Sequence, residues 1–387
     1  MKILLVGNYI NDRQISINRF ISLIEKGLNK IGHEVCRIQI TPVLGKFKPS
    51  VRGWGKWLGY IDKFLIFPFQ LRQYIDWADI VCICDQGFSY YTGYLRNKTH
   101  LVICHDLLAI RSALGEIPEN PTSWTGRQYQ SLIFKGLKQA QYIACSSEAT
   151  YADVLRLTQI NPNRVTVIED CLSEQYEQMA REEALTRVSK FNINLDSPLL
   201  IHVGGDQWYK NRLGLLTIFN YLRSQPDMGN IQLAMIGKPL SQEMHQFITI
   251  NNLQKHVIEI VTPSDDDLRA FYSIATALIF PSLKEGFGVP VIEAQVCGCP
   301  VFTSNRSPLT EICRDAAVYF DPQDHQSAAK IIAENLLNHE KMRQLKQQGF
   351  INADRFSFQR MIESYDKLFK QILDAANSSS STKTAIN

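Results

Sequence analysis

The sequence lacks the short motifs of the commonest nucleotide, zinc and redox sites. Its 387 residues contain no G-x-x-x-x-G-K-[ST] motif, and Gly-Asn-Tyr-Ile-Asn, not G-x-G-x-x-G, follows the first apolar run at residues 3–7. Nine cysteines are scattered along the chain, and the two close pairs have the spacing C-x-C where common zinc and redox sites have C-x-x-C. These absences argue against a dinucleotide-binding enzyme and against a structural zinc site.

Long apolar runs and a strong charge of either sign are also missing. No uncharged apolar stretch reaches the roughly 20 residues of a membrane-spanning helix, and the chain enters an apolar strand pattern at once, with no signal-peptide pattern. The net charge of +3 is too small to indicate a nucleic-acid partner. With 45% hydrophobic and 20% charged residues the composition is that of a globular protein. Cysteines inside apolar runs favour a reducing compartment, so we expect a cytoplasmic protein.

Short apolar runs alternate with longer helical patterns, and the series occurs twice. Alternation of this kind predicts parallel sheets covered on both faces. We therefore predict an α/β protein with two doubly wound, Rossmann-like domains facing across a cleft. One eight-stranded barrel is the alternative, but it needs a single continuous series. The expected strands are residues 3–7, 35–40, 80–84, 101–104, 142–145 and 165–168, then 199–203, 231–236, 257–261, 277–280, 300–303 and 317–320.

The most informative stretch is 281–300, Pro-Ser-Leu-Lys-Glu-Gly-Phe-Gly-Val-Pro-Val-Ile-Glu-Ala-Gln-Val-Cys-Gly-Cys-Pro. It follows an expected strand and predicts a glycine loop and a short helix, with Pro290 in the first turn and Gly298 at the end. Backbone N–H groups of such a loop, and the helix N-terminus behind it, attract a phosphate. Glu285 falls in the loop and Glu293 in the expected first turn, so we expect them to have different tasks. An acid in a first turn is also explained by the helix dipole alone.

Two further constellations follow expected strands. Residues 202–212, His-Val-Gly-Gly-Asp-Gln-Trp-Tyr-Lys-Asn-Arg, predict a glycine turn that an anion can approach, with Lys210 as the cation; an exposed lysine is the alternative. His105 and Asp106 come directly after the expected strand 101–104, at the edge of the sheet where ligands bind in such folds. A packed histidine is the alternative there, and Arg111 is a candidate partner for Asp106.

Together these motifs resemble those of the retaining, nucleotide-sugar-dependent glycosyltransferases of family four, within glycosyl transferases group 1, which have the GT-B fold. The resemblance covers nearly the whole chain and is strongest at 204–211 and 282–300. It implies catalytic roles for Glu285, which faces the donor sugar, and for His105 and Asp106. It also implies donor binding by Gly204, Gly205, Lys210, Asn211, Gly286, Phe287, Gly288, Val289 and, through the ribose, Glu293.

The chain departs from the family's pattern at two places. The family often has a second cation directly before the lysine, where this sequence has Tyr209, and Arg212 is the candidate replacement. The family's glycine pair after the first strand is absent. We carry over no specific residue there, and Arg13 and Arg19 are more simply explained as solvated helix charges.

The domain boundaries follow from the two strand series, and the resemblance implies what each domain does. We expect an N-terminal domain at 1–172, a helix and linker at 173–197, and a second domain at 198–355; the resemblance implies that the first is on the acceptor side and that the second binds the donor. It also implies that a last helix at 356–376 crosses back to the first domain. The remaining residues, 377–387, are serine-rich and are expected to be disordered.

The resemblance implies an enzyme that moves a sugar from a UDP- or GDP-sugar to a glycan, lipid or small-molecule acceptor, without a cofactor or a metal ion. The acidic run 265–267 is better explained as a helix start than as a D-x-D-type metal signature. Two alternatives stay open. One is a sugar-nucleotide epimerase on a similar scaffold, and the other is a catalytically silent nucleotide-sugar-binding subunit.

Basic and aromatic residues interleave between residues 46 and 74. Such a surface is able to lie on the anionic inner face of a membrane. Two ordinary amphipathic helices with aromatic residues in the core explain the pattern as well, and we favour that explanation. The residues concerned are Lys46, Lys48, Arg52, Trp54, Lys56, Trp57, Tyr60, Lys63, Phe64, Phe67, Phe69 and Arg72.

Overall fold

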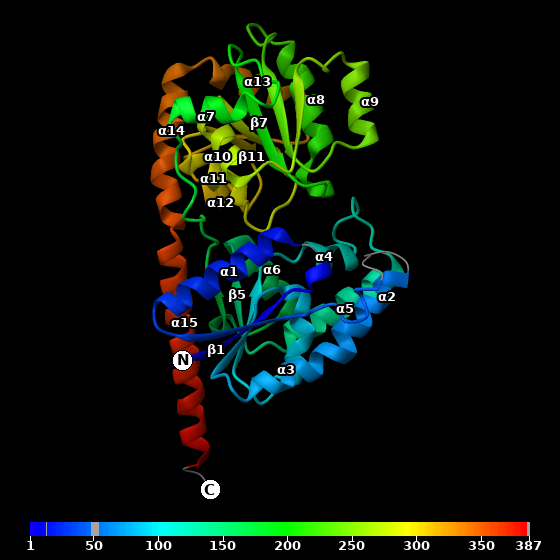
Figure 1. Ribbon diagram of the computed structural model, residues 1–387, viewed down its shortest axis with the longest axis vertical. Helices are drawn as coiled ribbons and strands as arrows, with labels where there is room; N and C mark the ends of the chain where they lie inside the picture. The colour runs from blue at the N-terminus through cyan, green and yellow to red at the C-terminus, as the bar shows by residue number, and fades with distance from the viewer. Residues whose placement is uncertain (13, 48–53, 385–387) are drawn as a thin grey trace. The chain divides into compact units, whose positions relative to one another are not determined.

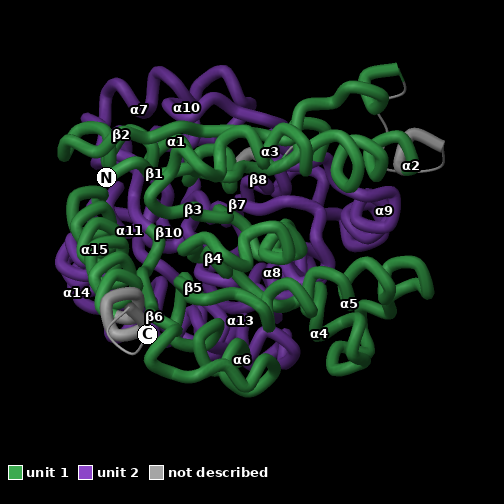
Figure 2. The backbone as a smooth tube through the Cα atoms, turned by 90° about the horizontal axis from the view of Figure 1, so that it is seen from below, with its two compact units in different colours: residues 1–170, 358–387 green, residues 171–357 purple. Residues whose placement is uncertain are grey.

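A computed structural model describes residues 1–12, 14–47 and 54–384. The chain divides into two compact units, coloured separately in Figure 2: unit 1 combines residues 1–170 with 358–387, and unit 2 comprises 171–357. All twelve expected strands are present, and they form two parallel six-stranded sheets. The predicted α/β architecture with two doubly wound sheets is therefore confirmed, and the barrel alternative is wrong.

The sheet of unit 1 has the strand order β2-β1-β3-β4-β5-β6, which the labels in Figure 2 follow. Figure 1 labels its strands β1 and β5. From β1 the chain moves outward to β2, and it then crosses back to β3 on the other side of β1. Between β1 and β3 lies the point where the strand order reverses. The strands are β1 (Lys2–Gly7), β2 (Glu34–Gln39), β3 (Ile80–Ile83), β4 (His100–Cys104), β5 (Tyr142–Cys145) and β6 (Val165–Val167).

Helices cover both faces of this sheet because alternate strand residues are apolar on each side. On one face α1 packs against α15, and the contact is so close that a Cβ on Gly27 would lie 2.3 Å from Ile362. On the other face Phe67, Phe88 and Leu137 pack against the sheet. The helical segments are η1 (Ile10–Asp12), α1 (Ile15–Lys30), α2 (Trp54–Ile61), η2 (Asp62–Ile66), α3 (Phe67–Ile75), η3 (Gln86–Tyr94), α4 (Leu108–Ala113), α5 (Trp124–Lys138), α6 (Glu148–Thr158), η4 (Pro162–Arg164) and α15 (Phe358–Thr384).

The last helix is longer than the sequence suggests. It runs to Thr384, so the disordered tail expected from residue 377 is wrong as far as the described residues extend. Ser378 Oγ donates to the Asp374 carbonyl at 2.9 Å. Serine composition argues against helix because such side chains compete for backbone groups, but this bond back to the preceding turn is compatible with a helix.

Unit 2 also contains a parallel six-stranded sheet, with the strand order β12-β11-β10-β7-β8-β9. Its order reverses between β7 and β10. The strands are β7 (Leu199–Gly204), β8 (Gln232–Gly237), β9 (Val257–Val261), β10 (Ala277–Phe280), β11 (Val301–Ser304) and β12 (Val318–Phe320). The helical segments are α7 (Arg181–Val188), η5 (Trp208–Lys210), α8 (Arg212–Arg223), α9 (Gln242–Ile250), α10 (Asp265–Ile274), α11 (Val289–Val296), α12 (Leu309–Cys313), α13 (His325–Leu336), α14 (His339–Ala353) and η6 (Asp354–Phe356).

The segment 173–197 is not a free linker. Tyr176, Met179, Ala184 and Val188 are buried in the core of unit 2 together with strand residues such as Ile201. The sequence signal was weak because only one side of α7 is apolar. The segment therefore belongs to the second unit.

Local capping follows the sequence. Ser147 accepts a hydrogen bond from the Thr150 N–H at 3.1 Å and caps α6. Ser264 forms a capping box with Asp267 at the start of α10, which explains the acidic run at 265–267. The helix start expected at residues 265–267 is confirmed.

Candidate active site

In each sheet, polar side chains follow the two strands between which the strand order reverses. Ligands of doubly wound sheets bind at this position, beyond the carboxyl ends of the strands, because the chains leaving the two neighbouring strands turn to opposite faces. In unit 2 the segments after β7 and β10 carry Lys210 and Glu285. In unit 1 the segments after β1 and β3 carry Tyr9 and Asp85, and His105 follows β4 directly.

Lys210 and Glu285 form an ion pair within unit 2. Lys210 Nζ donates to Glu285 Oε1 at 2.7 Å, and the two side chains are only 13% and 7% exposed. The ammonium also lies 4.9 Å from the centre of the Phe280 ring. The structure thus unites the two groups that the resemblance assigns to the diphosphate and to the sugar, 75 residues apart in the chain.

The backbone around this pair is open enough for an anion to approach. Gly237 has φ +133°, and a Cβ there would lie 2.2 Å from the Gly204 carbonyl oxygen, so the ends of β7 and β8 meet only through glycine. Gly288 has φ +111° and occupies the N-cap of α11, which has no side-chain cap. The first N–H groups of α11 are therefore not capped by a side chain, as a site for a phosphate requires.

The neighbours of Lys210 have structural tasks. Asn211 is in the left-handed conformation, and its amide donates to the carbonyls of Pro281 and Pro322 at 3.2 and 3.1 Å, tying together the segments after β10 and β12. Arg212 is buried and donates to the carbonyls of Lys238 and Pro239. Its role as the replacement for the second cation stays a prediction.

Tyr209 stands where the resembling enzymes have that cation. Its ring centre lies 5.5 Å from Lys210 Nζ, and its carbonyl accepts a hydrogen bond from the Leu283 N–H at 2.8 Å. The aromatic ring stabilises the ammonium instead of adding a second charge. Lys210 is therefore the cation that this loop places to bind an anion.

The glycine loop is anchored by Phe287, which the sequence assigned to donor binding. Its side chain is buried in the core and packs edge-on against Phe356 at 5.6 Å. Val289 is half-buried against the same core. Any contact of Phe287 with a ligand would have to come from its backbone.

Glu293 lies deeper than expected. Since α11 begins at Val289, Glu293 is in the second turn and not in the first, so the helix-dipole explanation loses its basis. The residue is 6% exposed, and Tyr272 donates from its hydroxyl to Glu293 Oε2 at 3.1 Å. Burial, and then the charge of Glu293, raises the pKa of Tyr272, so this hydroxyl remains a donor.

His105 is fixed within unit 1 by backbone groups. Its ring Nε2 lies 3.0 Å from the Cys84 carbonyl and therefore carries the proton. Its backbone N–H donates to the side-chain oxygen Oε1 of Gln86 at 2.9 Å. Phe20 packs edge-on against the imidazole at 4.8 Å. Burial raises the pKa of nearby Asp170, an effect that the charge of His105 opposes.

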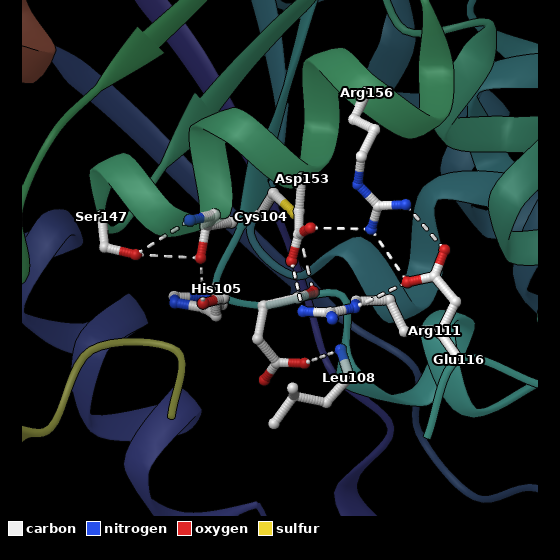
Figure 3. A network of polar contacts seen from close by, with 10 residues as sticks. Cys104, His105, Leu108, Arg111, Glu116, Ser147, Asp153 and Arg156 are labelled. Carbon is white, nitrogen blue, oxygen red and sulfur yellow. Dashed lines mark hydrogen bonds and ion pairs between the residues drawn. The ribbon is translucent and has the colours of Figure 1, made fainter. Parts of the chain in front are cut away.

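Asp106 accepts a hydrogen bond from the Leu108 N–H at 2.9 Å at the start of α4. The recorded ion pairs of Arg111 go elsewhere, to Glu116 and Asp153 at 2.9 and 2.8 Å (Figure 3). Arg156 bonds to the same two acids, and its hydrogen bond, followed by that from Arg111, holds the pKa of Glu116 at about 2. This network fastens α4 to α6.

A cavity of about 460 Å³, which the sequence did not predict, lies at the switch point of unit 1. We refer to it as the unit 1 pocket. Asp106 lines it, together with residues from five other segments. The signal available in the sequence was the position of Tyr9 and Asp85 after expected strands. The cavity is also lined by Asp12, Tyr60, Lys63, Gln86, Phe88, Tyr129 and Gln130.

The basic and aromatic segment 46–74 is divided between an inner and an outer face. Phe64 and Phe67 pack in the core. Lys63 is 7% exposed and pairs with Asp12 at 2.7 Å, so it does not belong to a membrane-facing surface. The outer face carries Trp57, Leu65, Phe69 and Arg72. Lys48 and Arg52 of the predicted patch, and Arg13 of the first loop, lie outside the described residues.

Within residues 1–12, 14–47 and 54–384, no three His, Cys, Asp or Glu side chains are grouped so as to hold a metal ion. In the same ranges no helix combines the length and hydrophobicity needed to cross a membrane.

Comparison with known proteins gives one consistent family. Residues 186–351 match the family model of Glycosyl transferases group 1. The O-antigen chain mannosyltransferase B of Escherichia coli is 25% identical over 329 residues, which is 83% of this chain and 84% of that protein.

Solved structures match along nearly the whole chain. The sucrose-phosphate synthase of Thermosynechococcus elongatus superposes with a TM-score of 0.77 at 18% identity, covering 97% of this chain and all of the other. Anabaena Alr3699/HepE, solved with UDP and glucose, superposes with a TM-score of 0.74 at 14% identity, covering 96% and 100%. The chain is thus a glycosyltransferase of the GT-B fold, and its residues 186–351 form a glycosyl transferases group 1 domain.

Proposed function

We propose that the chain is a retaining, metal-independent glycosyltransferase that moves a hexosyl residue from a nucleoside-diphosphate sugar to a glycan. The observation that carries the proposal is the Lys210–Glu285 pair at 2.7 Å between the uncapped end of α11 and the glycine turn after β7. It sets one cation and one carboxylate side by side at the switch point. That arrangement suits a diphosphate and the sugar attached to it.

Lys210 and the N-terminus of α11 would bind the diphosphate and stabilise the negative charge that grows on it as the bond to the sugar breaks. Glu285 would face the sugar, where positive charge develops in the transition state. Glu293, held by Tyr272, would bind the ribose hydroxyls. Fixed charges of this kind can stabilise charge separation without a metal ion, which is the basis for proposing metal independence.

The donor and acceptor classes are drawn from the relatives. The mannosyltransferase named above acts on an O-antigen chain by its name, which makes a mannosyl donor and a polysaccharide acceptor the first choices here. The HepE structure was solved with UDP and glucose, so UDP- and GDP-sugars both belong in a test. An acceptor that is a lipid-linked or small saccharide fits the same proposal.

The test is a panel of UDP-, GDP- and ADP-sugars screened for thermal stabilisation in the presence of chelator, because a ligand that binds the native state raises its stability. The best donor is then incubated with glycan acceptors, and the anomeric configuration of the product is determined by NMR. Conversion of the donor in the absence of acceptor would indicate an epimerase. Binding without any turnover would indicate a silent subunit, and inversion at the anomeric carbon would contradict a retaining enzyme.

A peripheral contact with the inner face of a membrane is a second feature of the proposal. Trp57, Leu65 and Phe69 are 59%, 61% and 67% exposed along one continuous helical segment, next to the basic side chain of Arg72. Aromatic and apolar side chains flanked by positive charge suit an anionic bilayer interface. This surface would keep the enzyme close to a lipid-linked acceptor.

A further inference from the structure

His202 lies near the end of β7 and carries a buried hydrogen-bond acceptor. The residue is 0% exposed, and its Nδ1 lies 3.1 Å from the Ile279 carbonyl oxygen. A carbonyl only accepts hydrogen bonds, so Nδ1 carries the proton and Nε2 is the acceptor. In the described part of the chain no group donates a hydrogen bond to Nε2. Since buried polar atoms are rarely left without a partner, this nitrogen indicates a donor that joins it when a ligand binds.

The Nε2 atom faces Gly204 and the side chain of Lys210. A Cβ on Gly204 would lie 2.9 Å from His202 Nε2 and 3.6 Å from Lys210 Cδ. The histidine and the lysine therefore border the same space, which any side chain at position 204 would enter. The ring of Phe280 adjoins both residues, with its centre 6.1 Å from that of the imidazole and 4.9 Å from Lys210 Nζ. The glycine turn after β7 thus allows His202 and Lys210 to approach each other.

The partner of Nε2 must be a donor, because the imidazole is neutral. Burial lowers the pKa of His202 to about 3; the bond to the Ile279 carbonyl opposes this shift, and the charges of Arg212 and Lys210 add to it. At neutral pH Nε2 therefore stays unprotonated. The oxygens of a diphosphate also only accept hydrogen bonds, so they cannot bond directly to this nitrogen. Lys210, which borders the same space, carries donors.

The Lys210 ammonium has enough donors for more than one partner. It has three N–H bonds, and the contact with Glu285 Oε1 at 2.7 Å uses one of them. In the proposed function Glu285 faces the sugar, and Lys210 binds the diphosphate. The ammonium is then best directed by a neutral acceptor, which fixes its orientation without adding a negative charge beside the phosphates. His202 Nε2 is such an acceptor.

We propose that His202 is a positioning residue for Lys210: with a nucleoside diphosphate bound, the ammonium donates one hydrogen bond to His202 Nε2 and another to the diphosphate. This inference rests on the proposed function and adds to it the group that directs the cation. A fixed acceptor restricts the rotamers of the lysine, and this lowers the entropy lost when the nucleotide binds. Tyr209 replaces the second cation of the resembling enzymes, so the direction of Lys210 matters the more.

Two substitutions separate the tasks of the two ring nitrogens. His202→Asn keeps an N–H donor near the position of Nδ1 and places no acceptor at the position of Nε2. His202→Gln reaches that position and places an acceptor there. Both variants lose the imidazole ring and its contact with Phe280. Calorimetry with UDP and with GDP should show about 10-fold weaker binding for His202→Asn and an affinity near that of the wild type for His202→Gln. Equal affinities of the two variants would contradict the proposal.

A second buried histidine provides the matched control. His100 in unit 1 is 1% exposed, its Nδ1 lies 2.8 Å from the Lys98 carbonyl, and its Nε2 accepts from the Gln141 N–H at 3.2 Å. His100→Asn should lower the melting temperature and leave the affinity for UDP and GDP unchanged. An equal loss of affinity in His100→Asn and His202→Asn would show that reduced stability alone weakens binding, and the proposal would fail.

A double-variant cycle tests whether His202 acts through Lys210. In the Lys210→Met background, which has no ammonium, His202→Asn and His202→Gln should bind UDP and GDP equally weakly, since the effects of residues in contact are coupled. A difference between them that persists in this background would show that the acceptor acts through another group, which would contradict the proposal.

Nitrogen-15 NMR of the wild-type chain gives a measurement that does not depend on the stability of any variant. Saturating UDP or GDP should move the His202 Nε2 resonance while the nitrogen stays unprotonated, and the movement should be absent in Lys210→Met. An unchanged resonance would overturn the proposal. Protonation of Nε2 on nucleotide binding would also overturn it, because His202 would then be a second cation. The proposed function fails separately, if no nucleotide sugar in the donor panel stabilises the chain.

Discussion

Replacement of Glu285 by glutamine should separate nucleotide binding from sugar transfer. Lys210 Nζ donates to Glu285 Oε1 at 2.7 Å. A diphosphate that binds Lys210 must displace or share this contact. Glu285→Gln removes the competing charge and keeps the size of the side chain. We therefore expect the variant to bind free nucleoside diphosphate more tightly than the wild type, while transfer becomes slower.

The magnitude follows from the geometry of the pair. Two unit charges at this distance attract by about 6 kcal/mol at an effective dielectric constant of about 20. Desolvation and side-chain ordering oppose most of that, so a net value of about 1 to 2 kcal/mol is reasonable for a largely buried pair. That range corresponds to a nucleotide affinity about 5- to 30-fold higher in the variant. Loss of one preorganised charge facing the sugar should lower kcat by about 10²-fold or more.

Calorimetry with the bare nucleoside diphosphate measures the nucleotide affinity, and steady-state kinetics with the complete donor measures kcat. Lys210→Gln is the matched control, and it should weaken nucleotide binding by about 10-fold or more because it removes the cation itself. The double variant tests whether the two effects are coupled, as residues in contact should be. Thermal unfolding identifies any variant that is simply destabilised.

The reasoning is refuted if Glu285→Gln binds nucleoside diphosphate more weakly than the wild type while its melting temperature is preserved. The carboxylate would then contribute to nucleotide binding directly. A variant with normal kcat would show that Glu285 does not respond to charge on the sugar in the transition state.

Four further predictions are independent of this one. Glu293→Gln should raise the donor KM and spare kcat, since a ribose contact is the same in ground and transition states; an unchanged Kd for nucleoside diphosphate would contradict it. Transfer should survive excess chelator, and activity that is lost and then restored by Mg²⁺ or Mn²⁺ would show that a metal is required. The double variant Leu65→Ser, Phe69→Ser should bind anionic vesicles more weakly at low salt, whereas Ile250→Ser, at a 78% exposed site in unit 2, should bind them like the wild type. If the wild type does not bind the vesicles, the membrane contact is excluded. Burial lowers the pKa of His202 to about 3, so the unfolded state binds more protons between about pH 3 and 6.5 and stability falls as the pH drops. His202→Gln should therefore flatten that dependence by about 1.4 kcal/mol per pH unit in denaturant titrations, and an unaltered slope would show that His202 does not cause it.

Much of the fold was predictable because its signals are local. A strand buried on both faces of a parallel sheet is an uninterrupted apolar run, so stretches such as 142–145 and 277–280 were found with their observed bounds. Caps such as Ser147 and Ser264 depend on residues within one turn. The tail beyond residue 377 was missed because composition says little about how far a helix continues.

The candidate site was predictable only in part. Motif spacing selected Lys210, Glu285, His105 and Asp106, and each lies beyond the carboxyl end of a strand, but their roles stay predictions. The burial of Phe287 and the carbonyl contacts of Asn211 were not visible, because both depend on segments distant in sequence. The unit 1 pocket was not predicted for the same reason.

The sequence by itself determined the two series of parallel strands, the glycine loops at their ends and the local caps. Only the tertiary structure decided which charges meet. The reversal of strand order between β7 and β10 brings Lys210 to Glu285, and that between β1 and β3 brings Tyr9 towards Asp85 in one pocket. Lys63, within a π-helical turn, is buried and pairs with Asp12, 51 residues away in the chain. Apolar periodicity fixes which face of an element is buried, but the pairing of polar side chains across loops depends on strand order, which periodicity does not encode.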